Sequence, residues 1–191
     1  MDMKNDIKEY YELAKSRLSE RRYTHSVNVA KAAVKLAVKY GEDVVKAETA
    51  GILHDITKEE KTENQLQILK SGGIILDDVS KNSPSLLHAI TGMVYSRDAL
   101  SIKDEDILNA IRYHTTGRAN MSLLEKIIFI ADFISDERDY DDVDVMRAEC
   151  EKSLEDGMVY GLGFVIPDLV ARKKAIHPDA LAAYNELVLN K

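Results

Sequence analysis

Apolar residues recur three and four positions apart along most of the chain, which is the spacing of one buried face of an α-helix. Val29, Ala33 and Leu36 follow this spacing, and Leu124 and Ile128 repeat it farther along the chain. Alternation with a period of two, which would indicate strands, is not sustained anywhere. The pattern predicts an all-α fold.

Glycine, serine and proline residues mark the expected helix ends. Gly41 and Gly72 end two apolar patterns, and Ser83-Pro84 begins another with serine as the cap and proline in the first turn. The chain has no repeat, linker or low-complexity tract, so we expect a single compact domain. The expected helices cover residues 5–18, 22–40, 43–54, 60–71, 84–98, 104–114, 121–134, 143–160, 162–175 and 179–189.

The composition is that of an ordinary globular protein. The 191 residues include 45% hydrophobic and 31% charged residues, which excludes disorder as the main state. The net charge of −7 argues against a nucleic-acid partner. The longest apolar run, Ile127 to Ala131, is far shorter than the ~20 residues of a membrane span, and no secretory signal is evident. Cys150 is the single cysteine, so we expect a cytoplasmic protein without disulfides or a membrane partner.

Polar residues that can bind metals lie on the apolar stripes. His25 shares a stripe with Val29, while His54, His114 and Asp132 each follow apolar residues at helical spacing. A single histidine in such a place is usually a core residue whose hydrogen bonds are satisfied. A carboxylate there loses several kcal/mol of hydration unless it is paired, protonated or bound to a cation. We therefore expect Asp132 to be in one of these three states.

The number of these residues favours a metal site. The inward or helix-end positions hold four of the five histidines and two acids: His25, His54, His88, His114, Asp55 and Asp132. Imidazole and carboxylate together suit a borderline divalent ion such as iron, manganese or zinc. His54 and Asp55 are neighbours, so both can reach one ion only beside the end of their helix. Such a set leaves ion positions open for water or substrate.

The adjacent His54-Asp55 pair resembles the signature of the HD-domain metal-dependent phosphohydrolases. Further motifs sharpen the resemblance: Lys58 after the pair, Leu86-Leu87-His88, His114-Thr115-Thr116-Gly117, and Ala131-Asp132 followed by Arg138. Over roughly residues 20–180, the chain is similar to the bacterial symmetrical bis(5′-nucleosyl)-tetraphosphatases, which use iron to cut diadenosine tetraphosphate into two ADP molecules. The resemblance implies an HD-domain helical bundle over residues 1–191, with a core at about 20–140 and C-terminal helices at 143–190 packing on it.

The resemblance also implies a role for each site residue. It assigns metal binding to His25, His54, Asp55 and Asp132; a second metal or phosphate contact to His88 and His114; substrate binding to Arg22, Lys58, Thr116, Arg138, Ile176 and His177; and catalysis to Asp55, Lys58 and His114. The chain departs from the family pattern in one place. Where the family usually reads Ile-Glu-Pro, this chain has Ile134-Ser135-Asp136, in the loop that presents Arg138.

Three of the assigned residues also have simple structural interpretations. Lys58 begins a charged run that would otherwise be a solvated surface, and Arg138 lies in an acidic loop where surface pairing is common. His177 precedes Pro178, as a residue at the start of a helix often does.

The resemblance predicts hydrolysis of a small nucleotide. One divalent ion, or two, would lower the pKa of a bound water from 15.7 toward about 7 and present hydroxide to an inner phosphorus. Symmetrical cleavage of a dinucleoside tetraphosphate would release two nucleoside diphosphates. The alternatives are another HD-domain nucleotide phosphohydrolase, such as a nucleotidase or phosphodiesterase, and a non-catalytic nucleotide-binding regulatory module. A homodimer is expected by analogy alone.

Overall fold

The computed structural model describes residues 3–190, and this part of the chain contains helices and no strand. The predicted all-α class is confirmed. Residues 1, 2 and 191 of the expected domain lie outside the described residues. The helices are α1 (Met3–Arg17), α2 (Glu20–Tyr40), α3 (Val44–Leu53), α4 (Thr62–Ser71), α5 (Asp78–Asn82), α6 (Pro84–Asp98), α7 (Glu105–Tyr113), α8 (Leu123–Ile134), α9 (Val143–Lys152), α10 (Leu154–Ala171) and α11 (Pro178–Leu189).

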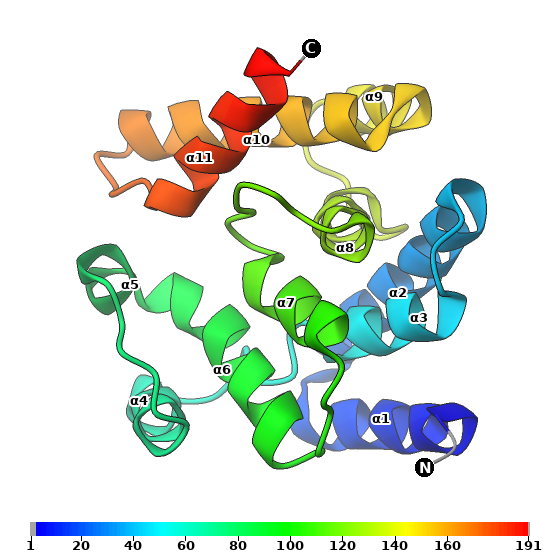
Figure 1. The fold of residues 1–191 in the computed structure, drawn as a ribbon, viewed down its shortest axis with the longest axis vertical. Coiled ribbons are helices and arrows are strands. Elements are labelled where there is room, and N and C mark those ends of the chain that lie inside the picture. Colours follow the sequence, from blue (N-terminus) through cyan, green and yellow to red (C-terminus); the bar gives the residue numbers. More distant parts are fainter. Residues whose placement is uncertain (1–2, 191) are drawn as a thin grey trace.

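Helix α8 occupies the middle of the molecule. It packs against α2, α3 and α7 on one side and against α9 and α10 on the other (Figure 1). Its residues Ile127 and Ile128 are fully buried, as are Ile52 and Leu53 of α3. None of the helices in residues 3–190 combines the length and the apolar character that a bilayer span requires.

The contact between α2 and α3 is unusually close because of Gly51. A Cβ atom at Gly51 would lie 2.7 Å from Cα of Ala30. Since no side chain separates the two backbones there, the C-terminal end of α3 is held against the N-terminal half of α2. His54, which follows the last residue of α3, is thereby brought to His25 of α2.

Two expectations about helix ends were wrong. The predicted break between residues 160 and 162 is instead at Ser153, whose hydroxyl accepts a hydrogen bond from the Asp156 backbone N–H at 2.9 Å and begins α10. Helix α10 continues through Gly161, because this glycine provides close packing against Met146 rather than a helix end. Ser83 precedes α6 as expected, but its side chain makes no capping hydrogen bond.

Helix α5 was not predicted. It has five residues, of which Ser80 is the buried one, so it carries no helical repeat of apolar residues. The Asp77 side chain starts it by accepting hydrogen bonds from the backbone N–H groups of Val79 and Ser80.

Candidate metal centre

Four histidines come together from four helices. His25 lies in α2, His54 directly follows α3, His88 lies in α6, and His114 directly follows α7. Their exposed fractions are 5%, 0%, 2% and 2%, respectively. Successive rings are in edge-to-face contact, with centroids 4.9–5.2 Å apart. The four side chains form one continuous row, which we call the histidine row.

The protonated nitrogen of each ring is fixed by a neighbouring acceptor. Nδ1 of His54 lies 2.7 Å from the Gly51 carbonyl, that of His88 lies 2.8 Å from the Ser85 carbonyl, and that of His114 lies 2.7 Å from the Ile111 carbonyl. A carbonyl oxygen only accepts hydrogen bonds, so each Nδ1 must donate. In a neutral ring, this leaves the Nε2 lone pair free to bind a cation.

The free nitrogens face one another in pairs. Nε2 of His54 lies 3.3 Å from Nε2 of His25, and Nε2 of His88 lies 3.1 Å from Nε2 of His114. Two lone pairs at such distances repel unless a proton or a cation lies between them. This pairing, together with nearby carboxylates, fits a divalent metal ion.

Asp55 lies between the two pairs of histidines. Its Oδ1 is 3.2 Å from Nε2 of His88, whereas its Oδ2 is 3.7 Å from Nε2 of His54. Oδ1 is buried and has no hydrogen-bond partner in the described structure. A buried carboxylate oxygen without a donor is unfavourable, and a cation would satisfy it. Three donor groups could hold an ion: His25 with His54 and Asp55, His54 with His114 and Asp132, and Asp55 with His88 and His114.

Asp132 reaches the centre from α8. Its Oδ1 lies 3.1 Å from Nε2 of His25 and also accepts a short hydrogen bond from Arg138. Its side chain is 22% exposed, more than its place on an apolar stripe suggests, and it lies two residues before the end of α8. In the structure, Asp132 is therefore paired with His25 and Arg138.

The pKa shifts are consistent with cation binding. Burial lowers the pKa of His54 to about 4 and lowers that of His88, so both rings are neutral at pH 7. Burial acts to raise the pKa of Asp55, but the surrounding histidines and Lys58 outweigh it and hold that pKa well below its usual range. The centre thus combines ionised carboxylate with neutral imidazole, the protonation states that metal binding requires.

Cationic residues surround the carboxylates. Nζ of Lys58 lies 2.9 Å from Nε2 of His88 and 3.5 Å from Oδ1 of Asp55, and burial lowers the pKa of this lysine. On the other side, Nη1 of Arg22 lies 3.4 Å from Oδ2 of Asp55. Lys58 is therefore part of the centre and not of a solvated charged surface.

Two cavities adjoin the centre. The first has a volume of about 610 Å³, and we call it the Lys58 cavity; besides Lys58, its lining includes Thr115, Thr116, Leu162 and Arg172. The second has a volume of about 490 Å³, and we call it the arginine cleft; it is lined by Arg21, Arg22, Thr24, His25, Glu137, Arg138, Asp139 and Tyr140. Both volumes fall in the range of small-molecule sites, about 300–1,000 Å³.

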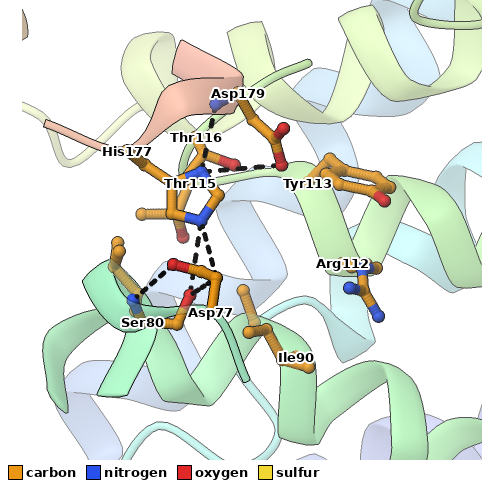
Figure 2. Close-up of a pocket in the computed structure, with 11 residues that line it drawn as sticks. Asp77, Ser80, Ile90, Arg112, Tyr113, Thr115, Thr116, His177 and Asp179 are labelled. Carbon is orange, nitrogen blue, oxygen red and sulfur yellow. Dashed lines mark hydrogen bonds and ion pairs between the residues drawn. The ribbon is translucent and has the colours of Figure 1, made fainter. Parts of the chain in front are cut away.

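His177 and Ile176 have different places at the Lys58 cavity. His177 lines it, and Nδ1 of this histidine accepts a hydrogen bond from the Asp179 backbone N–H at the start of α11. Figure 2 shows its ring between Asp179 and Asp77, with Nε2 3.2 Å from Oδ2 of Asp77. Ile176 is instead packed against the hydrophobic core and does not line the cavity.

The sequence did not reveal two residues of this region. Glu137 accepts a short hydrogen bond from Nδ1 of His25, and it also binds Asn28 and Ser135. Thr115 has its hydroxyl 3.3 Å from Nε2 of His88, whereas the hydroxyl of the expected Thr116 donates to the Gly117 carbonyl. Nothing in the acidic sequence around Glu137 indicates its contact with His25. The position of Thr115 directly after His114 could have indicated that Thr115 lies near the histidines.

Helices that bring a His-Asp pair together with further histidines and a distant aspartate define an HD-domain protein. The HD domain family matches residues 22–135, and the chain belongs to this family.

The relatives give the particular branch of that family. The chain is 41% identical to a protein named symmetrical bis(5′-nucleosyl)-tetraphosphatase from Halalkalibacterium halodurans, over 94% of this chain and 96% of the relative. A Bacillus subtilis protein of the same name is 38% identical over 91% of this chain and 93% of the relative. The expected resemblance to symmetrical bis(5′-nucleosyl)-tetraphosphatases is confirmed.

A solved structure agrees with the fold. The crystal structure of a Clostridium acetobutylicum protein, described as a predicted HD superfamily hydrolase involved in NAD metabolism, superposes with a TM-score of 0.93 at 36% identity. The match covers 96% of this chain and 97% of the other. The helical arrangement is thus that of an HD-domain hydrolase over almost its whole length.

Proposed function

We infer that this chain is a symmetrical bis(5′-nucleosyl)-tetraphosphatase, a hydrolase of acid anhydrides. One water would be added across the central P–O–P bond of a dinucleoside tetraphosphate, and each half would leave as a nucleoside diphosphate. Diadenosine tetraphosphate would give two ADP molecules. The observation that carries this inference is the histidine row around Asp55, with cationic side chains on both sides of the carboxylate.

We propose that His25, His54, Asp55 and Asp132 hold one divalent ion, and that Asp55, His88 and His114 can hold a second. Iron is the expected metal, with manganese and zinc as alternatives. A bound ion of this kind neutralises phosphate oxygens and lowers the pKa of water toward about 7. The Nδ1 contacts support the assignment because they orient each Nε2 toward the centre.

The cations of this chain would stabilise the negative charge of the polyphosphate. We propose that Lys58 binds the phosphates on one side of Asp55 and that Arg22 and Arg138 bind them on the other. Since burial lowers the pKa of Lys58, its ammonium group releases a proton more readily than an exposed lysine does. We propose that Lys58, whose Nζ lies 3.5 Å from Oδ1 of Asp55, also donates the proton to the leaving phosphate, and that His114 takes this role when it binds no ion.

The Lys58 cavity would bind one nucleoside. Its apolar wall, which includes Leu162 and Leu169, suits a base, and Thr116 and His177 offer polar atoms for the ribose. Ile176 would support this wall from the core. A cytoplasmic location and a homodimer stay predictions of the sequence.

The test is the identity of the product. Protein purified without oxygen and loaded with Fe²⁺ is incubated with diadenosine tetraphosphate, and nucleotides are separated by anion-exchange chromatography. Two ADP molecules per substrate support the proposal. AMP with ATP would show asymmetric cleavage, and binding without product would show a regulatory module.

A pair of variants tests whether turnover depends on the candidate metal centre. Asp132→Ala should lose both bound metal and turnover, because it removes a carboxylate 3.1 Å from His25. Asp144→Ala removes a carboxylate that is 92% exposed on α9 and serves as the control. Full metal content and full turnover in Asp132→Ala would exclude this residue from the site.

A further inference from the structure

The two oxygens of Asp55 face different cavities. Oδ1 is directed toward Lys58, at 3.5 Å, and this lysine lines the Lys58 cavity. Oδ2 is directed toward Arg22, at 3.4 Å, and toward His25, at 4.0 Å, and both residues line the arginine cleft. The candidate metal centre therefore lies where two ligand-sized spaces meet.

The two spaces offer different chemistry. The Lys58 cavity has an apolar wall from α10, at Leu162, Val165 and Leu169. The arginine cleft is lined by three arginines and the half-buried ring of Tyr140, and by two acids, Asp139 and Glu137, of which Glu137 is paired with His25. It suits a ligand that carries phosphates at one end and a flat, polar group at the other.

We propose that the arginine cleft binds the second nucleoside diphosphate half of the substrate. This inference rests on the proposed function, because cleavage at the middle of a dinucleoside tetraphosphate places an equal half on each side of the broken bond. The Lys58 cavity receives one half, and the arginine cleft receives the other. The second half is what distinguishes a dinucleotide from any mononucleotide.

The contacts assign a part to each residue of the cleft. Arg22 and Arg138 lie beside the carboxylates of Asp55 and Asp132, next to the bond that breaks, and bind the two phosphates of the second half. Tyr140 lies farther along the chain from Arg138 and offers its ring to the base. Its hydroxyl donates to the Phe133 carbonyl at 3.2 Å, and its ring rests on Phe164 with centroids 5.7 Å apart, so the ring is held in place.

Arg21 supplies a cation that the fold itself does not use. Its side chain is exposed, and within residues 3–190 it takes part in no hydrogen bond, ion pair or ring contact. The neighbouring Arg22, in contrast, forms an ion pair with Asp55, close to the bond that breaks. Arg21 is therefore available at the mouth of the cleft for the phosphate nearest the second nucleoside.

The first experiment compares two substrates that carry the same four phosphates. Diadenosine tetraphosphate has two nucleosides, whereas adenosine 5′-tetraphosphate has one and would be cut to ADP and pyrophosphate. For the Fe²⁺-loaded protein, kcat/KM should favour the dinucleotide at least about fivefold, the lower end of what stacking of one base on an aromatic ring provides. Tyr140→Leu should abolish this preference, and Tyr140→Phe, which keeps the ring, should retain it.

A charge-reversal pair provides the matched control. Arg172→Glu changes an arginine at the Lys58 cavity, which receives the nucleoside that both substrates share. This variant should reduce kcat/KM for both substrates by the same factor and leave their ratio unchanged. Melting curves establish that each variant is folded.

A second measurement does not depend on the folding of Tyr140→Leu. Calorimetric titration of the metal-loaded protein with ADP should give two molecules bound per chain, one in each space. Arg21→Glu, at an exposed position, should reduce this number to one at the same ADP concentrations.

The outcomes separate the two claims. A wild-type protein that binds one ADP, or that cuts both tetraphosphates with equal kcat/KM, would overturn the assignment of the cleft while the hydrolase function stands. Equal loss of both activities in Tyr140→Leu would overturn it as well. A wild-type protein that cuts neither substrate would instead refute the proposed function.

Discussion

Glu137 offers a direct test of how the metal centre is built. Its carboxylate accepts the hydrogen of Nδ1 of His25, and two further bonds hold the carboxylate in place, from Nδ2 of Asn28 and from the hydroxyl of Ser135, both at 2.8 Å. Glu137→Gln keeps the size and one acceptor oxygen but removes the negative charge. His25 then becomes a weaker electron donor to a bound cation.

The size of the effect follows from the exposure of the contact. Loss of such a supporting carboxylate typically weakens metal affinity about 10–100-fold. The Glu137 side chain is 30% exposed, so water partly replaces the lost interaction, and we expect the lower end of this range. A tenfold change corresponds to about 1.4 kcal/mol of binding free energy. Glu137→Ala, which removes the acceptor altogether, should have a larger effect.

The assay is competition for Mn²⁺ or Zn²⁺ with a chromophoric chelator at neutral pH. Glu151→Gln is the control, because this glutamate side chain is 81% exposed on α9 and carries the same chemical change. Nitrogen NMR of the zinc-loaded protein reports which nitrogen of His25 carries the hydrogen. An affinity of Glu137→Gln within twofold of wild type, with the same His25 tautomer, would refute the reasoning.

Three further outcomes follow from the structure. Removal of metal with a chelator should lower the melting temperature, measured by calorimetry, by about 5–10 °C if the ion was present at ~100 times its Kd. An unchanged melting temperature would contradict a bound ion in the core. Gly51→Ala should destabilise the protein by about 1–3 kcal/mol in urea unfolding, because the new Cβ would lie 2.7 Å from Cα of Ala30. The control is Gly163→Ala, which has nothing within 4 Å and should be neutral or stabilising by about 0.5–1 kcal/mol. Equal effects of the two substitutions would exclude close packing as the cause. Burial raises the pKa of Cys150 from 9.0 to about 12, so the folded state keeps this proton longer than the unfolded state, and stability should fall as pH rises from about 9 toward 12. A thiol reagent should accordingly modify Cys150 slowly at pH 8 until urea is added, and fast modification of the native protein would contradict its burial.

The long helices could be predicted because each has one apolar face, as α2 and α8 show. Helix α5 could not, since a capping aspartate and one buried serine define it and neither forms a repeat. The helix boundary at Ser153 was missed because another residue gives a stronger signal for a helix end. Gly161 is the stronger signal in the sequence, but its small size serves packing against Met146 inside a continuous helix.

The sequence predicted those site residues whose side chains are positioned by a regular helix. The positions of His25 and Asp132 on apolar stripes indicated that both side chains meet, and the structure brings them within 3.1 Å. Glu137 and Thr115 lie in a loop and a turn, where the helical repeat gives no orientation. Which loop acid turns toward His25 depends on the bonds from Asn28 and Ser135, and these pairings cannot be derived from spacing.

Three histidines of the row owe their ring orientation to a carbonyl three residues earlier: His54 to Gly51, His88 to Ser85, and His114 to Ile111. Each of these rings is therefore aligned by a backbone group of its own helical turn. His25 differs, because its alignment comes from Glu137 in the loop after α8. Mutations in that loop can therefore adjust one end of the centre while the other end stays the same. Residues 135–142 are thus the segment through which the His25 end of the centre can be tuned, within the limits set by the pairing of Arg138 with Asp132.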